Sequence, residues 1–128
     1  MVRGILGVVA GAVGWFLVVA VLGWGMRQAW PAYASVAEEM AFTLPMLFAR
    51  LGIGAVATLL AGALAAAVGG RRAAAGAGGL LLVGFVPVHV ALWTVFPLWY
   101  HATFLLSLVP LAVLGGAAAA RAGALPAP

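Results

Sequence analysis

The chain has no cysteine, lysine, aspartate or asparagine, and its acidic side chains are limited to Glu38 and Glu39. Without cysteine it can form no disulfide framework, no thiolate metal site and no dithiol redox couple. Two adjacent glutamates project to different sides of a helix, so this spacing gives neither a paired carboxylate site nor a metal-hydrolysis motif. We therefore expect no enzymatic activity, no metal and no cofactor. The glutamates are interpreted as N-terminal charges on a helix that starts after Ser35.

Charge of either sign is scarce. Only 6% of the 128 residues are charged and 67% are hydrophobic, whereas soluble domains contain about 25% charged residues. The mean hydropathy is +1.26. The six arginines are dispersed between apolar stretches, and binding of nucleic acid needs a contiguous basic surface. The composition predicts an all-α integral membrane protein that contacts the lipid bilayer and binds no nucleic acid.

Four long apolar runs divide the chain. An α-helix needs about 20 apolar residues to cross a hydrocarbon core of about 30 Å. Runs of sufficient length extend over about residues 5–26, 40–68, 79–96 and 100–120. The predicted fold is a four-helix transmembrane bundle that forms one domain over residues 1–128, with a turn at GGRRAAAGAG and a bend at FPLW.

The arginines predict the orientation of these spans. Cytoplasmic loops are enriched in basic residues, and an inside N-terminus gives the cytoplasmic side the larger set, which is Arg3, Arg71, Arg72 and Arg121. Both termini are then cytoplasmic, as in a protein of a bacterial inner membrane. The alternative is a signal peptide cleaved near Ala32-Tyr33-Ala34, but its apolar region would be too long.

Small residues predict where the helices approach closely. Gly7 and Gly11 are four residues apart in the first span. The second span repeats small residues at the same step, at Gly54, Thr58, Gly62 and Ala66. Such faces allow close packing in lipid, so we expect the second span to be the central helix.

A buried polar layer is predicted around His89. If the third span ends at Phe96, His89 lies about 10 Å inside the outer edge, and an ionisable residue at that depth is a functional hypothesis. Indexing through the FPLW bend places Ser107 at the same level, and Thr58 and Trp15 reach a similar depth. The alternative interpretation is a neutral histidine that joins two helices by a hydrogen bond.

A second group of candidate contacts is predicted at the outer face. Arg50 lies near the outer end of the second span, on one helical face with Glu39. It is interpreted either as an arginine extending to the headgroups or as an anion contact. The remaining candidates are Trp99, Tyr100 and His101. They are interpreted either as interfacial anchors or as a shallow binding surface for a lipid headgroup, a quinone or a partner subunit. His101 is expected about 8 Å from the depth of His89, so the two histidines should neither pair nor share a haem.

Residues 40–55 (MAFTLPMLFARLGIGA) and 96–111 (FPLWYHATFLLSLVPL) resemble stretches of small four-span bacterial membrane proteins. The resemblance implies that fold and no activity. The sequence therefore predicts a non-enzymatic accessory, assembly or interaction subunit that forms a homo-oligomer or joins a larger membrane complex. The alternative is a small oligomeric transporter or channel with a polar path near Arg50, Thr58, His89 and Ser107.

Overall fold

The computed structural model describes residues 1–126, which contain helices and turns and no strand. Its helices are α1 (Val2–Ala29), α2 (Pro31–Val36), α3 (Leu44–Gly69), α4 (Arg71–Ala91) and α5 (Leu98–Arg121). All except α2 are long and apolar enough to cross a membrane. This suggests an integral membrane protein, and the all-helical architecture with four long apolar helices agrees with the prediction.

The ends of the helices differ from the prediction at three places. The GGRRAAAGAG stretch is helical from Arg71, because Gly70 alone makes the turn at a φ of 86°. The next helix ends at Ala91 and not at Phe96. No helix starts directly after Ser35, because α2 ends at Val36 and a turn over residues 37–40 follows, in which Glu38 and Glu39 are exposed.

α3 is the central helix, as predicted, and packs against α1, α4 and α5. Its small residues Gly54, Thr58, Gly62 and Ala66 are all buried. A Cβ atom on Gly62 would collide with the backbone of Ala112 in α5. Backbone contact of this kind requires a residue without a side chain, because any added atom would push the two helices apart.

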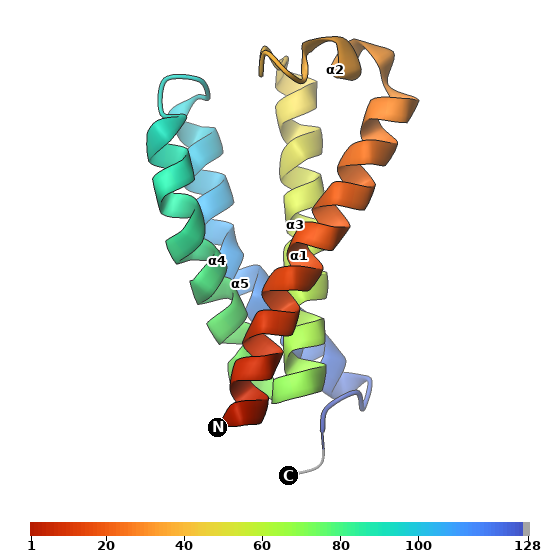
Figure 1. The fold of residues 1–128 in the computed structure, drawn as a ribbon, viewed down its shortest axis with the longest axis vertical. Helices are drawn as coiled ribbons and strands as arrows, with labels where there is room; N and C mark the ends of the chain where they lie inside the picture. The colour runs from red at the N-terminus through yellow and green to blue at the C-terminus, as the bar shows by residue number, and fades with distance from the viewer. Residues whose placement is uncertain (127–128) are drawn as a thin grey trace.

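The bundle is narrow at one end and wide at the other (Figure 1). The N-terminus and the end of α5 lie at the narrow end, where glycine and alanine fill the interfaces. Toward the opposite end, α1 and α3 diverge from α4 and α5. The side chains between the helices there are large and include Trp15, Phe85 and Phe104. This widening is where a cavity forms.

Candidate functional site

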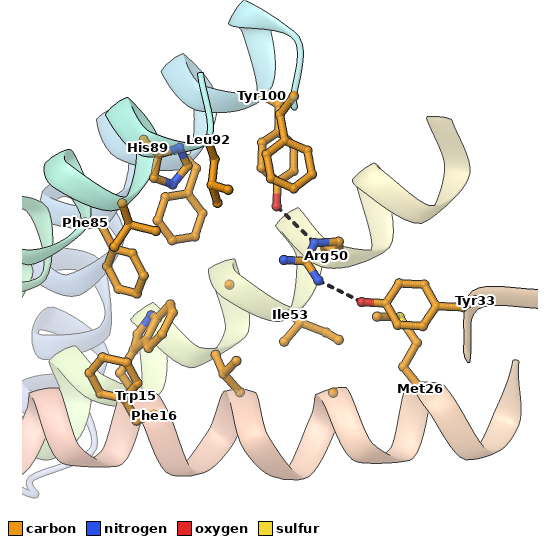
Figure 2. Close-up of a pocket in the computed structure, with 16 residues that line it drawn as sticks. Trp15, Phe16, Met26, Tyr33, Arg50, Ile53, Phe85, His89, Leu92 and Tyr100 are labelled. Atoms are coloured by element: carbon orange, nitrogen blue, oxygen red, sulfur yellow. Dashed lines mark hydrogen bonds between the residues drawn. The ribbon is translucent and has the colours of Figure 1, made fainter. Parts of the chain in front are cut away.

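A cavity of about 310 Å³ lies in the wide half of the bundle. This volume is at the lower end of the range for small-molecule sites. Its walls come from all four long helices and are mainly apolar and aromatic. The polar side chains with a group directed at the cavity are Tyr33, Arg50, His89 and Tyr100, and Trp15 forms part of the floor (Figure 2).

Arg50 is held by two tyrosine hydroxyls. Its Nε donates a hydrogen bond to the Tyr100 hydroxyl at 3.3 Å, and its Nη1 donates to the Tyr33 hydroxyl at 2.8 Å (Figure 2). The tyrosines come from α5 and α2, and only 4% and 3% of their surfaces are exposed. The guanidinium is therefore fixed in position by side chains that are themselves fixed by packing.

Aromatic rings enclose Arg50 on the side of the wide end. Its guanidinium carbon lies 4.6 Å from the centre of the Phe42 ring and 5.9 Å from that of Phe96. Phe42 stacks on Tyr33 at 5.1 Å, and Phe96 stacks on Tyr100 at 4.8 Å. These contacts stabilise a cation, but they supply no negative charge.

The polar groups around Arg50 are hydrogen-bond donors. Each tyrosine oxygen accepts from the guanidinium, so its own proton remains free to be donated elsewhere. Within residues 1–126 Nη2 of Arg50 makes no hydrogen bond, and no buried side-chain nitrogen or oxygen lacks a partner. Nη2 must therefore lie at an accessible surface, where it can donate to a bound group.

The two histidines form a pair, which overturns the prediction that they lie at different depths. Their Nδ1 atoms are 2.7 Å apart. The prediction was wrong because α4 ends at Ala91, so His89 is next to the end of its helix, while His101 is in the first turn of α5. His101 is also buried, with 1% of its surface exposed, so its ring faces the protein interior.

The predicted polar layer is only partly assembled. The Trp15 indole donates to the Thr58 hydroxyl at 3.0 Å, and Thr58 donates to the Gly54 carbonyl at 2.6 Å. Ser107, in contrast, bonds within its own helix to the Phe104 carbonyl and not to His89. The Trp15 indole, the Thr58 hydroxyl and the Ser107 hydroxyl therefore all donate their protons inside the protein, and of these three residues only Trp15 lines the cavity that contains Arg50.

The expected path through four polar residues is split between two cavities. Arg50 and His89 line the first, whereas Thr58 and Ser107 line a second cavity of about 360 Å³ between α3 and α5. Gly54 and Phe104 line both and form the partition.

The remaining predicted contacts lie outside this site. Glu39 is in the exposed turn after α2 and shares no helix with Arg50, contrary to the prediction. Trp99 faces outward and packs on Phe48, with ring centres 5.4 Å apart. The sequence interpretation missed Tyr33, which lies in a segment expected to be a loop. The available signal was Pro31, a residue typical of the first turn of a helix.

Two further observations bear on the kind of site. Among residues 1–126 no group of three or more histidine, cysteine or acidic side chains is close enough to hold a metal ion. Comparison with family models, curated proteins and solved structures finds no match to the chain.

Proposed function

We propose that the chain is a non-enzymatic membrane protein whose cavity binds the oxyanion head, a carboxylate or a phosphate, of a single-chain amphiphile. The observation that carries this proposal is the environment of Arg50. Within residues 1–126 its hydrogen-bond partners are hydroxyls and not carboxylates. A charge removed from water is costly unless it is paired, and a bound oxyanion would pair it while accepting from Nη2 and both tyrosines.

The tail of such a ligand would leave the cavity sideways. Phe16 on α1 and Val88 on α4 line the cavity, yet 57% and 43% of their surfaces are exposed. We propose that this exposed surface faces lipid in a membrane. An amphiphile could therefore enter between α1 and α4 directly from the bilayer, with its head at Arg50 and its acyl chain in the hydrocarbon.

The orientation proposed for the site follows from the arginines. The N-terminus and the end of α5 lie at the narrow end (Figure 1), and the turn between α3 and α4 lies there too. The arginines of this end are Arg3, Arg71, Arg72 and Arg121. By the positive-inside rule this end is cytoplasmic, so the cavity would open in the outer half of a bacterial inner membrane.

The role of an accessory subunit, in a homo-oligomer or a larger complex, fits this proposal because holding a lipid requires no catalytic group. A channel fits less well. The residues expected to line its path occupy two cavities, which favours a binding site over a continuous pathway.

Calorimetric titration of the purified protein in a non-ionic detergent tests the proposal. Dodecanoate and dodecyl phosphate should bind, and their relative affinities identify the preferred head. Dodecanol and dodecyltrimethylammonium should bind at least about tenfold more weakly. The loss of one charged hydrogen bond accounts for a difference of this size.

Two arginine variants make the test specific. Arg50→Met should weaken anion binding by about 10- to 100-fold, whereas Arg27→Met removes the same charge from an exposed position at the end of α1 and should leave it unchanged. Arg50→Lys should restore part of the affinity, because a lysine keeps the charge without the planar fork of donors. Equal binding of dodecanol and dodecanoate, or equal effects of the two Met variants, would overturn the proposal.

A further inference from the structure

The hydrogen bonds of the histidine pair determine which nitrogen atoms carry protons. His101 Nε2 lies 3.3 Å from the carbonyl oxygen of Trp93, in the turn between α4 and α5. A carbonyl only accepts, so Nε2 must carry a hydrogen. A neutral imidazole has a single N–H, which leaves the Nδ1 atom of His101 as an acceptor.

The same argument extends to His89. Its Nδ1 is 2.7 Å from the acceptor Nδ1 of His101 and must therefore be the donor. In neutral His89 the remaining nitrogen, Nε2, then has a free lone pair. The Trp93 carbonyl thus fixes the tautomer of His101, and His101 in turn fixes the tautomer of His89.

The free nitrogen of His89 is available to the cavity. His89 lines the cavity, and its Nε2 has no hydrogen-bond partner within residues 1–126. No buried side-chain nitrogen or oxygen in that range lacks a partner, so Nε2 must reach the accessible surface. The ring is held by near-parallel stacking on Phe104, with centroids 4.7 Å apart.

The cavity therefore combines two kinds of hydrogen-bonding group. Arg50, Tyr33 and Tyr100 offer donors, and His89 Nε2 is the side-chain acceptor. The ring of Tyr100 lies 6.3 Å from that of His89, while its hydroxyl contacts Arg50. Tyr100 therefore links the acceptor to the donors, because its ring stacks on His89 and its hydroxyl accepts from Arg50.

We infer that the preferred amphiphile carries a hydroxyl group close to its oxyanion head, and that His89 Nε2 accepts a hydrogen bond from this hydroxyl. A 3-hydroxy fatty acid has this arrangement. A plain fatty acid offers acceptors only and leaves the histidine lone pair without a partner inside the cavity. The inference rests on the proposed function, because it places the oxyanion at Arg50.

Paired ligands test this inference at about pH 8, where histidine is neutral. The wild-type protein should bind 3-hydroxydodecanoate about three- to tenfold more tightly than dodecanoate, which is the effect of one additional hydrogen bond. The two ligands share the head and the chain length, so their affinity ratio isolates the hydroxyl.

Two variants of His89 separate the acceptor from the structural role of the ring. In His89→Asn the amide nitrogen occupies the place of Nδ1 and can still donate to His101, but no atom replaces Nε2. The ratio of the affinities for 3-hydroxydodecanoate and dodecanoate should fall to about one in this variant, while dodecanoate still binds. In His89→Gln the side-chain amide reaches the place of Nε2 and supplies an acceptor oxygen, so a preference for the hydroxylated acid should remain.

The outcomes distinguish this inference from the proposed function. If neither dodecanoate nor dodecyl phosphate binds the wild-type protein, the proposed function and the inference both fail. If both acids bind with equal affinity, only the hydroxyl preference is refuted. A ratio that is unchanged in His89→Asn would also refute it, since the hydroxyl would then be recognised elsewhere.

Discussion

The Nδ1 atoms of His89 and His101 lie 2.7 Å apart and join the last turn of α4 to the first turn of α5. Trp93 completes this unit. Its carbonyl accepts from His101, and its indole stacks on the His101 ring at a centroid distance of 5.0 Å and an angle of 13°. The turn between the two helices is thus tied to one wall of the cavity.

The first prediction concerns the tautomers of this pair. At neutral pH His89 should carry its proton on Nδ1 and His101 on Nε2, because the Trp93 carbonyl can only accept. Nitrogen-15 NMR of histidine-labelled protein distinguishes these forms by the chemical shifts of the two ring nitrogens. Assignment by the single variants His89→Asn and His101→Asn identifies the rings. Two identical Nε2–H tautomers would contradict the prediction.

The histidine pair also shows why the sequence located the spans but not the site. The four apolar helices follow from the composition, because apolar runs of this length have few other structures. The end of α4 does not, since no glycine or proline follows Ala91 until Pro97. Beyond the helix, the Trp93 segment turns and packs on His101. His89 is therefore in the last turn of its helix, and local sequence patterns do not encode this tertiary contact.

Arg50 likewise shows what the sequence can and cannot predict. Counting residues along the span places Arg50 near one end of it, and in the structure Arg50 is in the second turn of α3. Its partners come from α2 and α5, which lie 17 and 50 residues away. Nothing in the residues next to Arg50 specifies which tyrosine it contacts, so the donor cluster appears only in three dimensions.

A second prediction tests the tyrosine hydroxyls. Tyr100→Phe and Tyr33→Phe should each weaken dodecanoate binding by about three- to tenfold, since each removes one donor to the anion. The rings and their stacking remain, so thermal unfolding in detergent should change little. Trp99→Phe, at a neighbouring outward-facing position, provides the control and should leave the affinity unchanged. An unaltered affinity in both tyrosine variants would show that the anion does not reach these hydroxyls.

A third prediction concerns the bond between Trp15 and Thr58 below the cavity. Trp15→Phe removes the indole N–H, and Thr58→Val removes the hydroxyl at nearly constant volume. A double-mutant cycle on unfolding in mixed micelles should give a coupling of about 0.6 kcal/mol, which is the average for interhelical hydrogen bonds in membranes. A coupling of zero would mean that the 3.0 Å contact contributes nothing to stability.

A fourth prediction concerns close packing at the narrow end. A Cβ atom on Gly115 would collide with the Leu59 carbonyl, whereas one on Gly52 in α3 would meet nothing within 4 Å. Gly115→Ala should therefore destabilise the bundle by about 1–3 kcal/mol, as overpacking does. Gly52→Ala should stabilise it slightly, by up to about 1 kcal/mol, because alanine favours a helix. Equal melting temperatures for the two variants would contradict this packing.

The last prediction tests the orientation, and it exploits the absence of cysteine because each introduced thiol is the only one in the chain. Gln28→Cys lies at the wide end, close to α2, and should react with an impermeant maleimide added to intact cells. Arg71→Cys, in the turn between α3 and α4, should react only after the membrane is permeabilised. Because Arg71→Cys removes one basic residue, Ala122→Cys provides a control that keeps all six arginines and should behave like Arg71→Cys. The reverse pattern would place the cavity in the inner half of the bilayer, where an amphiphile would have to arrive from the cytoplasmic leaflet.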